Sequence, residues 1–89
     1  MAWSIEIDKD VQRFIEKLDK PVARRIAALL LAASLDDPRS QGRALTGNLA
    51  GLWRYRVGDY RMICDIEDGV MLILVVDLEH RSRVYRRRR

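Results

Sequence analysis

The sequence predicts a small α+β domain, in which an N-terminal strand and a two-helix hairpin pack on an antiparallel β-meander. Two observations predict this fold. Apolar residues alternate near the N-terminus and then recur at helical spacing up to residue 34. Further on, the turn sequences Gly58-Asp59 and Asp68-Gly69 separate three runs of strand-forming residues. Because 89 residues suffice for one core, we expect a single domain that spans residues 1–89.

The spacing of apolar residues changes from period two to helical spacing near residue 8, which predicts a strand followed by a helix. Residues 3–7 alternate with period two, which predicts a short strand with Trp3, Ile5 and Ile7 facing inward. Asp8 can then cap a helix over residues 8–18, because a carboxylate accepts hydrogen bonds from the free N–H groups of a first turn. The apolar residues of this helix are Val11, Phe14, Ile15 and Leu18.

A second helix is predicted from Pro21 to about Ser34. Proline suits the first turn of a helix, where its missing N–H group is harmless. The helix should end before Pro38, since proline disfavours helical geometry in the residue before it. Its buried stripe is expected to contain Val22, Ile26, Leu29, Leu30 and Ala33. Residues 39–51 are rich in glycine and show little periodicity, so we interpret them as a connection.

The meander is predicted from three strands, at residues 52–57, 60–67 and 70–78, joined by two-residue turns. The last strand is apolar on both faces, which is typical of a strand with neighbours on both sides. It therefore leaves room for the N-terminal strand to pair with it or with another strand. Tyr60, Met62, Cys64 and Ile66 should face the helices.

Arginines give the first hairpin its most distinctive pattern. A two-residue loop at Gly58-Asp59 places Arg56 opposite Arg61, and Arg54 extends the same face by one period. Like charges directly opposed across strands destabilise a sheet, so this arrangement favours an anionic ligand, of which phosphate is the obvious example. Arginine suits this ligand because its planar fork binds phosphate oxygens in pairs.

The net charge of +4 is modest, but six arginines lie among the last nine residues. They are Arg81, Arg83 and residues 86–89. An isolated basic tail is as consistent with a solvated end as with nucleic-acid contact. The arginine hairpin favours nucleic-acid contact.

Several classes of protein are excluded by composition. The single cysteine, Cys64, excludes an internal disulfide, and we interpret it as a small buried hydrophobic residue. No signal peptide is apparent and no apolar run reaches the about 20 residues of a membrane span, so we expect a cytoplasmic protein without membrane contact. No cluster of His, Cys, Asp and Glu has metal-ligand spacing, so neither a metal nor another cofactor is expected.

The remaining polar groups suit cleavage of RNA without metal. In that reaction the ribose 2′-hydroxyl attacks its adjacent phosphate, which requires a base, an acid and donors for the phosphoryl oxygens. Arginine supplies only the donors, because it stays protonated. The proton transfers would then involve His80 or Tyr85, although His80 could be a surface residue and Tyr85 could cap the core.

Two sequence blocks carry a family resemblance. Residues 45–61 read LTGNLAGLWRYRVGDYR, and His80-Arg81-x-x-Val84-Tyr85 follows the last strand. Together with the order of elements, they resemble the RelE branch of the RelE/ParE toxin superfamily. The resemblance implies a toxin of a toxin-antitoxin pair, which cleaves mRNA on the ribosome without metal and inhibits translation. It also implies a RelB-like antitoxin partner and a toxin-antitoxin complex that is a higher hetero-oligomer.

The resemblance also implies roles for residues. Arg61, Arg81, Tyr85 and His80 are expected to be catalytic, and Arg54, Arg56 and Arg83 to bind substrate. The well-studied toxin type has lysines at the positions of Arg54 and Arg56. Many relatives have arginine and glycine where this chain has Asp77 and Glu79, and these two acids are expected to weaken the attraction for phosphate.

Two alternatives remain open. A ParE-like protein on the same fold would inhibit DNA gyrase without cleaving RNA. A non-catalytic nucleic-acid-binding module would bind through counterion release by its arginines, with steep salt dependence.

Overall fold

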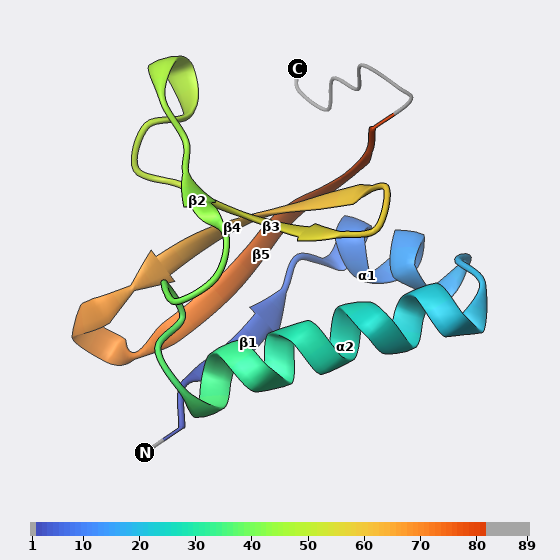
Figure 1. Ribbon diagram of the computed structural model, residues 1–89, viewed down its shortest axis with the longest axis horizontal. Helices are drawn as coiled ribbons and strands as arrows, with labels where there is room; N and C mark the ends of the chain where they lie inside the picture. Colours follow the sequence, from blue (N-terminus) through green and yellow to red (C-terminus); the bar gives the residue numbers. More distant parts are fainter. Residues whose placement is uncertain (1, 82–89) are drawn as a thin grey trace.

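A five-stranded sheet and two helices make up residues 2–81, the part of the chain that the computed structural model describes (Figure 1). The sheet order is β1-β5-β4-β3-β2, and β1 is parallel to β5 while the other pairs are antiparallel. The predicted α+β class is therefore confirmed. The elements in chain order are β1 (Ser4–Ile7), α1 (Lys9–Glu16), α2 (Lys20–Leu35), β2 (Arg43–Ala44), η1 (Gly47–Leu49), β3 (Trp53–Val57), β4 (Tyr60–Glu67), η2 (Asp68–Val70) and β5 (Leu72–His80).

The start of α1 is fixed as the sequence predicts. The Asp8 carboxylate accepts a hydrogen bond of 2.9 Å from the backbone N–H of Asp10. The helix ends two residues earlier than expected, because the N–H groups of Lys17 and Leu18 bond three residues back, to Phe14 and Ile15. These tighter bonds close the last turn and allow α2 to begin at Lys20.

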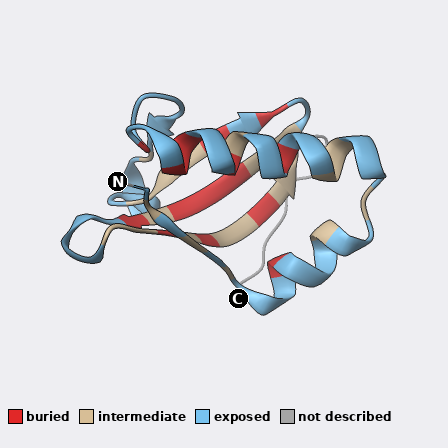
Figure 2. Ribbon diagram, turned by 90° about the horizontal axis from the view of Figure 1, so that it is seen from below, coloured by how far each residue is buried: buried red, intermediate tan, exposed pale blue. Residues whose placement is uncertain are grey.

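Both helices cover one face of the sheet (Figure 2). The hydrophobic core lies between the helices and this face. The two sheet faces differ accordingly. On the covered face, the predicted inward residues Met62 and Cys64 are fully buried. Burial raises the pKa of the Cys64 thiol to about 12, so this group is a neutral part of the core. The core consists of Val11, Ile26, Leu30, Ala33, Tyr55, Val57, Met62, Cys64, Ile73, Val75 and Leu78.

The position of β5 confirms the prediction made from its apolar character. It lies between β1 and β4, where Ile73 pairs with Ile5 on one side and Ile66 on the other. A strand in this position has both edges paired and receives side-chain contacts from both neighbours. The N-terminal strand β1 therefore pairs with β5, which is one of the two pairings that the sequence allowed.

The predicted two-residue turn at Asp68-Gly69 is wrong. The chain forms η2 there and reaches β5 through Met71, which has a left-handed φ of 51°. The Asp68 carboxylate is bound by the Arg39 guanidinium through bonds of 2.8 and 3.0 Å, which holds the longer turn in place. The register moves by two residues. Because side chains alternate with period two, the predicted faces remain correct.

A β-bulge in β5 changes the faces near its end. Cys64 pairs with Val75 and Ile63 pairs with Asp77, so Val76 is the extra residue. In a regular ladder Asp77 would enter the core opposite Met62. The bulge instead places Leu78 there, with 1% of its surface exposed, and moves Asp77 and Glu79 to the open face of the sheet.

Candidate functional site

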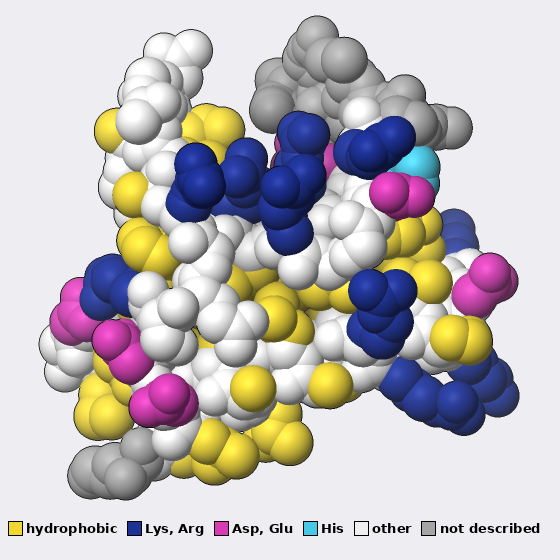
Figure 3. All heavy atoms as spheres, in the orientation of Figure 1, with side chains coloured by type: hydrophobic (Ala, Val, Ile, Leu, Met, Phe, Trp, Pro, Cys, Tyr) yellow, Lys and Arg dark blue, Asp and Glu magenta, His cyan; other side chains and the backbone are white. Residues whose placement is uncertain are grey.

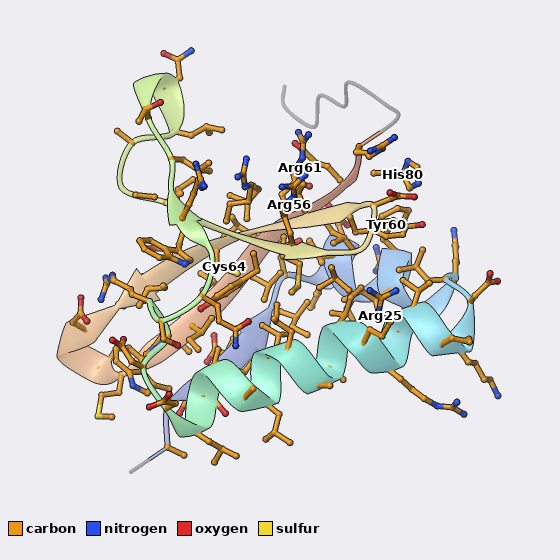
Figure 4. All side chains as sticks on the ribbon, viewed as in Figure 1. Arg25, Arg56, Tyr60, Arg61, Cys64 and His80 are labelled. Carbon is orange, nitrogen blue, oxygen red and sulfur yellow. The ribbon has the colours of Figure 1, made fainter. Side chains whose placement is uncertain are left out.

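Arginines gather on the open face of the sheet, opposite the helices. Arg56 pairs with Arg61 across the hairpin, as the two-residue loop predicts. Figure 4 shows their side chains side by side, pointing away from α2. Arg54 lies on the same face, because it is two residues from Arg56 in β3. The structure thus brings together three of the arginines that were predicted to contact substrate.

A fourth arginine, which the sequence pattern does not predict, joins these three on the open face. Residues 43 and 44 form β2, which pairs with β3 so that Arg43 stands directly opposite Arg54. A two-residue strand is too short to show alternation, and glycines surround it, so it was interpreted as part of a connection. We call Arg43, Arg54, Arg56 and Arg61 the arginine face. Figure 3 shows a row of Lys and Arg side chains along the top of the molecule, with others elsewhere on its surface.

The Arg54 guanidinium is the most constrained member of the arginine face. Its Nε atom is buried and has no hydrogen-bond partner among the described residues. Desolvation lowers its pKa, and the charges of Arg56, Arg61 and Arg43 lower it further. Arginine nonetheless stays protonated at any working pH. A buried donor without an acceptor costs stability, so Arg54 is held here at a cost to the fold.

Acidic residues lie at one end of the arginine face. Glu79 stands opposite Arg61, and Asp77 stands opposite Ile63. Both belong to β5, which is separated from β3 by β4 and therefore lies roughly 10 Å from it. The two acids of β5 consequently oppose the field of Arg61 more than that of Arg54, whereas Asp65 of β4 lies on the same face and stands diagonally across from Arg54.

Arg81 lies at the same end of the sheet as the Arg56–Arg61 pair. Its backbone N–H donates a bond of 2.7 Å to the Asp59 carbonyl, in the turn that joins β3 to β4. Its Nε is 3.6 Å from the Asp59 carboxylate, and both side chains are exposed. An exposed ion pair of this kind contributes little to stability, so Arg81 can exchange Asp59 for another anion.

His80 is not brought to the arginine face. It pairs with Tyr60, and the two rings meet edge to face with 4.9 Å between their centroids. Tyr60 packs against the core, so its cross-strand partner shares the face that the helices cover. Tyr60 in turn contacts Phe14 of α1 at 6.4 Å between ring centroids. The predicted placement of His80 near the arginines is wrong: both lie at one end of the sheet, but strand alternation puts them on opposite faces. Arg83 and Tyr85 lie outside the described residues.

The chain matches toxins of toxin-antitoxin systems, both as a family and among curated proteins. Residues 5–85 match the family model described as the ParE toxin of type II toxin-antitoxin systems, parDE. The chain is similar to Toxin RelE of Mycobacterium tuberculosis, with 27% identity over 84 residues that cover 94% of this chain and 87% of the relative. It is also similar to Toxin RelG of the same organism, with 24% identity over 98% of this chain and 100% of the relative.

Solved structures share the fold. The RelBE2 toxin-antitoxin complex from M. tuberculosis matches with a TM-score of 0.81 and 22% identity, over 91% of this chain and 100% of the matched chain. The archaeal RelE-RelB complex from Pyrococcus horikoshii matches with a TM-score of 0.75 and 28% identity, over 94% and 100%. The isolated Escherichia coli RelE toxin matches with a TM-score of 0.78 and 19% identity, over 92% and 87%.

Proposed function

Since this chain belongs to the ParE toxin family of type II toxin-antitoxin systems and is most like RelE toxins among the relatives described above, we propose that it is a RelE-type, ribosome-dependent endoribonuclease. The proposal is that this toxin cleaves mRNA without metal and so inhibits translation. The observation that supports it is the pairing of Arg56 with Arg61 beside Arg54, on the face of the sheet that the helices leave open.

The proposed reaction is a transfer of the phosphate to the neighbouring ribose. The 2′-oxygen attacks the phosphorus, the bond to the 5′-oxygen of the next nucleotide breaks, and a 2′,3′-cyclic phosphate and a free 5′-hydroxyl remain. The 2′-hydroxyl loses its proton to a base, and the leaving oxygen gains one from an acid. Negative charge grows on the phosphoryl oxygens, where donors that are already in place stabilise the transition state most.

In this reaction the arginine face would hold the phosphate. Arg61 and Arg56, with Arg81 at the strand end, donate hydrogen bonds to the phosphoryl oxygens, while Arg54 and Arg83 bind the substrate backbone. Arginine cannot take the proton, so the proposal needs another group. The position of His80 against Tyr60 favours Tyr85 as the residue that moves or orients the proton.

The proposed partners are the ribosome with its mRNA, and a RelB-like antitoxin that silences the toxin. The similar structures from M. tuberculosis and P. horikoshii are complexes with such partners, which supports a hetero-oligomeric toxin-antitoxin complex here. We place this function in the cytoplasm, where translation occurs. Among residues 2–81, no helix has the length and apolar character to cross a bilayer.

A second candidate function is inhibition of DNA gyrase, which the ParE description of the matching family model supports. A supercoiling assay with purified gyrase separates the two. The nuclease proposal predicts no effect on supercoiling, whereas a gyrase inhibitor would block it. A third reading, a nucleic-acid-binding module without catalysis, predicts salt-dependent RNA binding and intact RNA.

The experiment that tests the nuclease proposal maps mRNA ends on purified ribosomes. The purified protein is added to ribosomes programmed with a defined message, and primer extension locates new 5′ ends. We expect translation arrest with cuts confined to ribosome-bound message, and much slower cleavage of the same RNA in free solution. An intact message on arrested or active ribosomes would refute the proposal.

A further inference from the structure

A pocket lies at the outer edge of β3, where the chain approaches β2. Its volume is about 240 Å³, and its walls combine arginines with apolar and backbone groups. Past Arg54, this edge of β3 has no strand partner among the described residues, because β2 extends only over Arg43–Ala44. The lining residues are Leu29, Gln41, Gly42, Arg43, Arg54, Tyr55 and Arg56.

The walls of this pocket are fixed before any ligand arrives. The Trp53 indole N–H donates a bond of 2.7 Å to the Gln41 carbonyl, and the Tyr55 hydroxyl donates one of 2.6 Å to the Pro38 carbonyl. Gly42 has a φ of 84°, and a Cβ there would lie 2.3 Å from the Arg54 carbonyl oxygen, so only glycine allows this approach. A pocket with fixed walls loses little conformational entropy when it binds.

The charge of the pocket points to an anion. Arg43 and Arg54 stand directly opposite each other, which destabilises an isolated sheet. The Arg54 Nε is buried without a described partner, and the residues directly opposite Arg54 on its two neighbouring strands are Arg43 and Ile63. Of the acids on the open face, Asp77 and Glu79 belong to β5, and Asp65 of β4 is two residues from Ile63 and therefore stands diagonally across from Arg54. Arg43, Arg54 and Arg56 thus face this one diagonal carboxylate, so the corner keeps a net positive charge.

The spacing of the arginines along β3 is compatible with a second phosphate. Arg54 and Arg56 are two residues apart in a strand, so their backbones lie about 7 Å apart, roughly one nucleotide of an extended single strand. If the Arg56–Arg61 pair holds the phosphate that is cleaved, Arg54 and Arg43 face the next one along the chain. The pocket then lies beside the sugar and base attached to that phosphate.

We propose that this corner is a subsite for the nucleotide next to the cleaved bond. In it, Arg43 and Arg54 bind the phosphate, and the pocket beside Leu29 and Gly42 receives the sugar and base. This inference rests on the proposed nuclease function, since it takes the cleaved phosphate to lie at Arg56 and Arg61. It adds Arg43 as a substrate-binding residue and predicts that affinity grows when the RNA extends beyond a single phosphate.

The test compares a dinucleotide, which has one phosphodiester, with a trinucleotide, which has two. Both probes are 2′-O-methyl RNA, which has no free 2′-hydroxyl and is not cleaved. Binding to the ¹⁵N-labelled protein is followed by NMR at low salt, where weak phosphate contacts are least screened. We expect the trinucleotide to bind about five- to tenfold more tightly than the dinucleotide and to shift the Gly42 and Arg43 amide signals.

Arg43→Gln should remove most of the gain from the second phosphate while changing dinucleotide affinity less than about twofold. Arg24→Gln is the matched control, because it removes the same charge from an exposed position on α2. Arg43→Gln should also keep or raise the melting temperature, since it relieves the like-charge pair with Arg54. A folding defect therefore cannot imitate the expected result.

Three outcomes would overturn the subsite. Arg43→Gln could weaken the binding of both probes to the same extent as Arg24→Gln does, which would show that Arg43 contributes only long-range electrostatic attraction. A trinucleotide without the base at its added nucleotide could bind as tightly as the intact one, which would remove the base from the pocket. Both probes could fail to bind the wild-type protein. None of these decides the nuclease proposal, which mRNA mapping on the ribosome tests separately.

Discussion

Glu79 stands directly opposite Arg61 on the open face of the sheet, and the bulge at Val76 puts it there. The toxin thus places a carboxylate beside an arginine that we propose to stabilise the cleaved phosphate. Opposite charges at a cross-strand pair attract each other, so Glu79 competes with phosphate for Arg61. The strength of this competition is measurable.

Replacing Glu79 by glutamine should strengthen RNA binding, because it removes the competing charge and retains the shape of the side chain. We expect the affinity for single-stranded RNA at low salt to rise about two- to fivefold, with a smaller rise at high salt. Asp77→Asn is the comparison, and it should have a smaller effect because Asp77 stands opposite Ile63. Weaker RNA binding by Glu79→Gln would contradict this competition and would show that Glu79 helps to position Arg61 for RNA.

Deletion of Val76 should destabilise the fold strongly. Without the extra residue, either Asp77 enters the core opposite Met62 or the end of β5 loses its pairing with β4. An uncompensated buried carboxyl group costs several kcal/mol, so we expect the free energy of unfolding in urea to fall by about 3 kcal/mol or more. Val76→Ala retains the bulge and should cost about 1 kcal/mol. Equal stability of the two variants would contradict the role given to the bulge.

Stability should decline in mild alkali because of Cys64. Burial raises the pKa of its thiol from an ordinary 9.0 to about 12. Between these values the unfolded chain releases the thiol proton and the folded chain keeps it, so the contribution of Cys64 is present below pH 9 and is lost as pH rises towards 12. The free energy of unfolding of Cys64→Ala should therefore depend less on pH above 9. Parallel pH profiles for the two proteins would exclude this cause.

The hairpin at the centre of the site was predictable in detail. A two-residue loop allows one register, so the pairing of Arg56 with Arg61 followed from Gly58-Asp59 alone. The predicted β4–β5 turn is too short by two residues, yet the faces of β5 before the bulge at Val76 are the predicted ones, because side chains alternate with period two. Such an error changes which residues pair and leaves unchanged which residues face the core.

The bulge and β2 were not predicted, for different reasons. The bulge leaves a signal in the sequence. In a regular strand all inward residues are an even number of positions apart, whereas the inward residues Val75 and Leu78 are three positions apart. The apolar Val76 conceals this change of phase. For β2, no local pattern exists, because Arg43 is held by tertiary contacts such as the Trp53 bond to Gln41. The same change of phase places Glu79, rather than His80, on the arginine face.

The central claim is that the arginine face stabilises the phosphate during cleavage, and the most direct test is the single-turnover rate of mRNA cleavage on the ribosome by Arg61→Gln. Arg24→Gln serves as the control for charge. We expect the Arg61 variant to remain folded and to cleave about 100-fold more slowly or worse, with the control near the wild-type rate. Cleavage by Arg61→Gln at the wild-type rate would contradict the account.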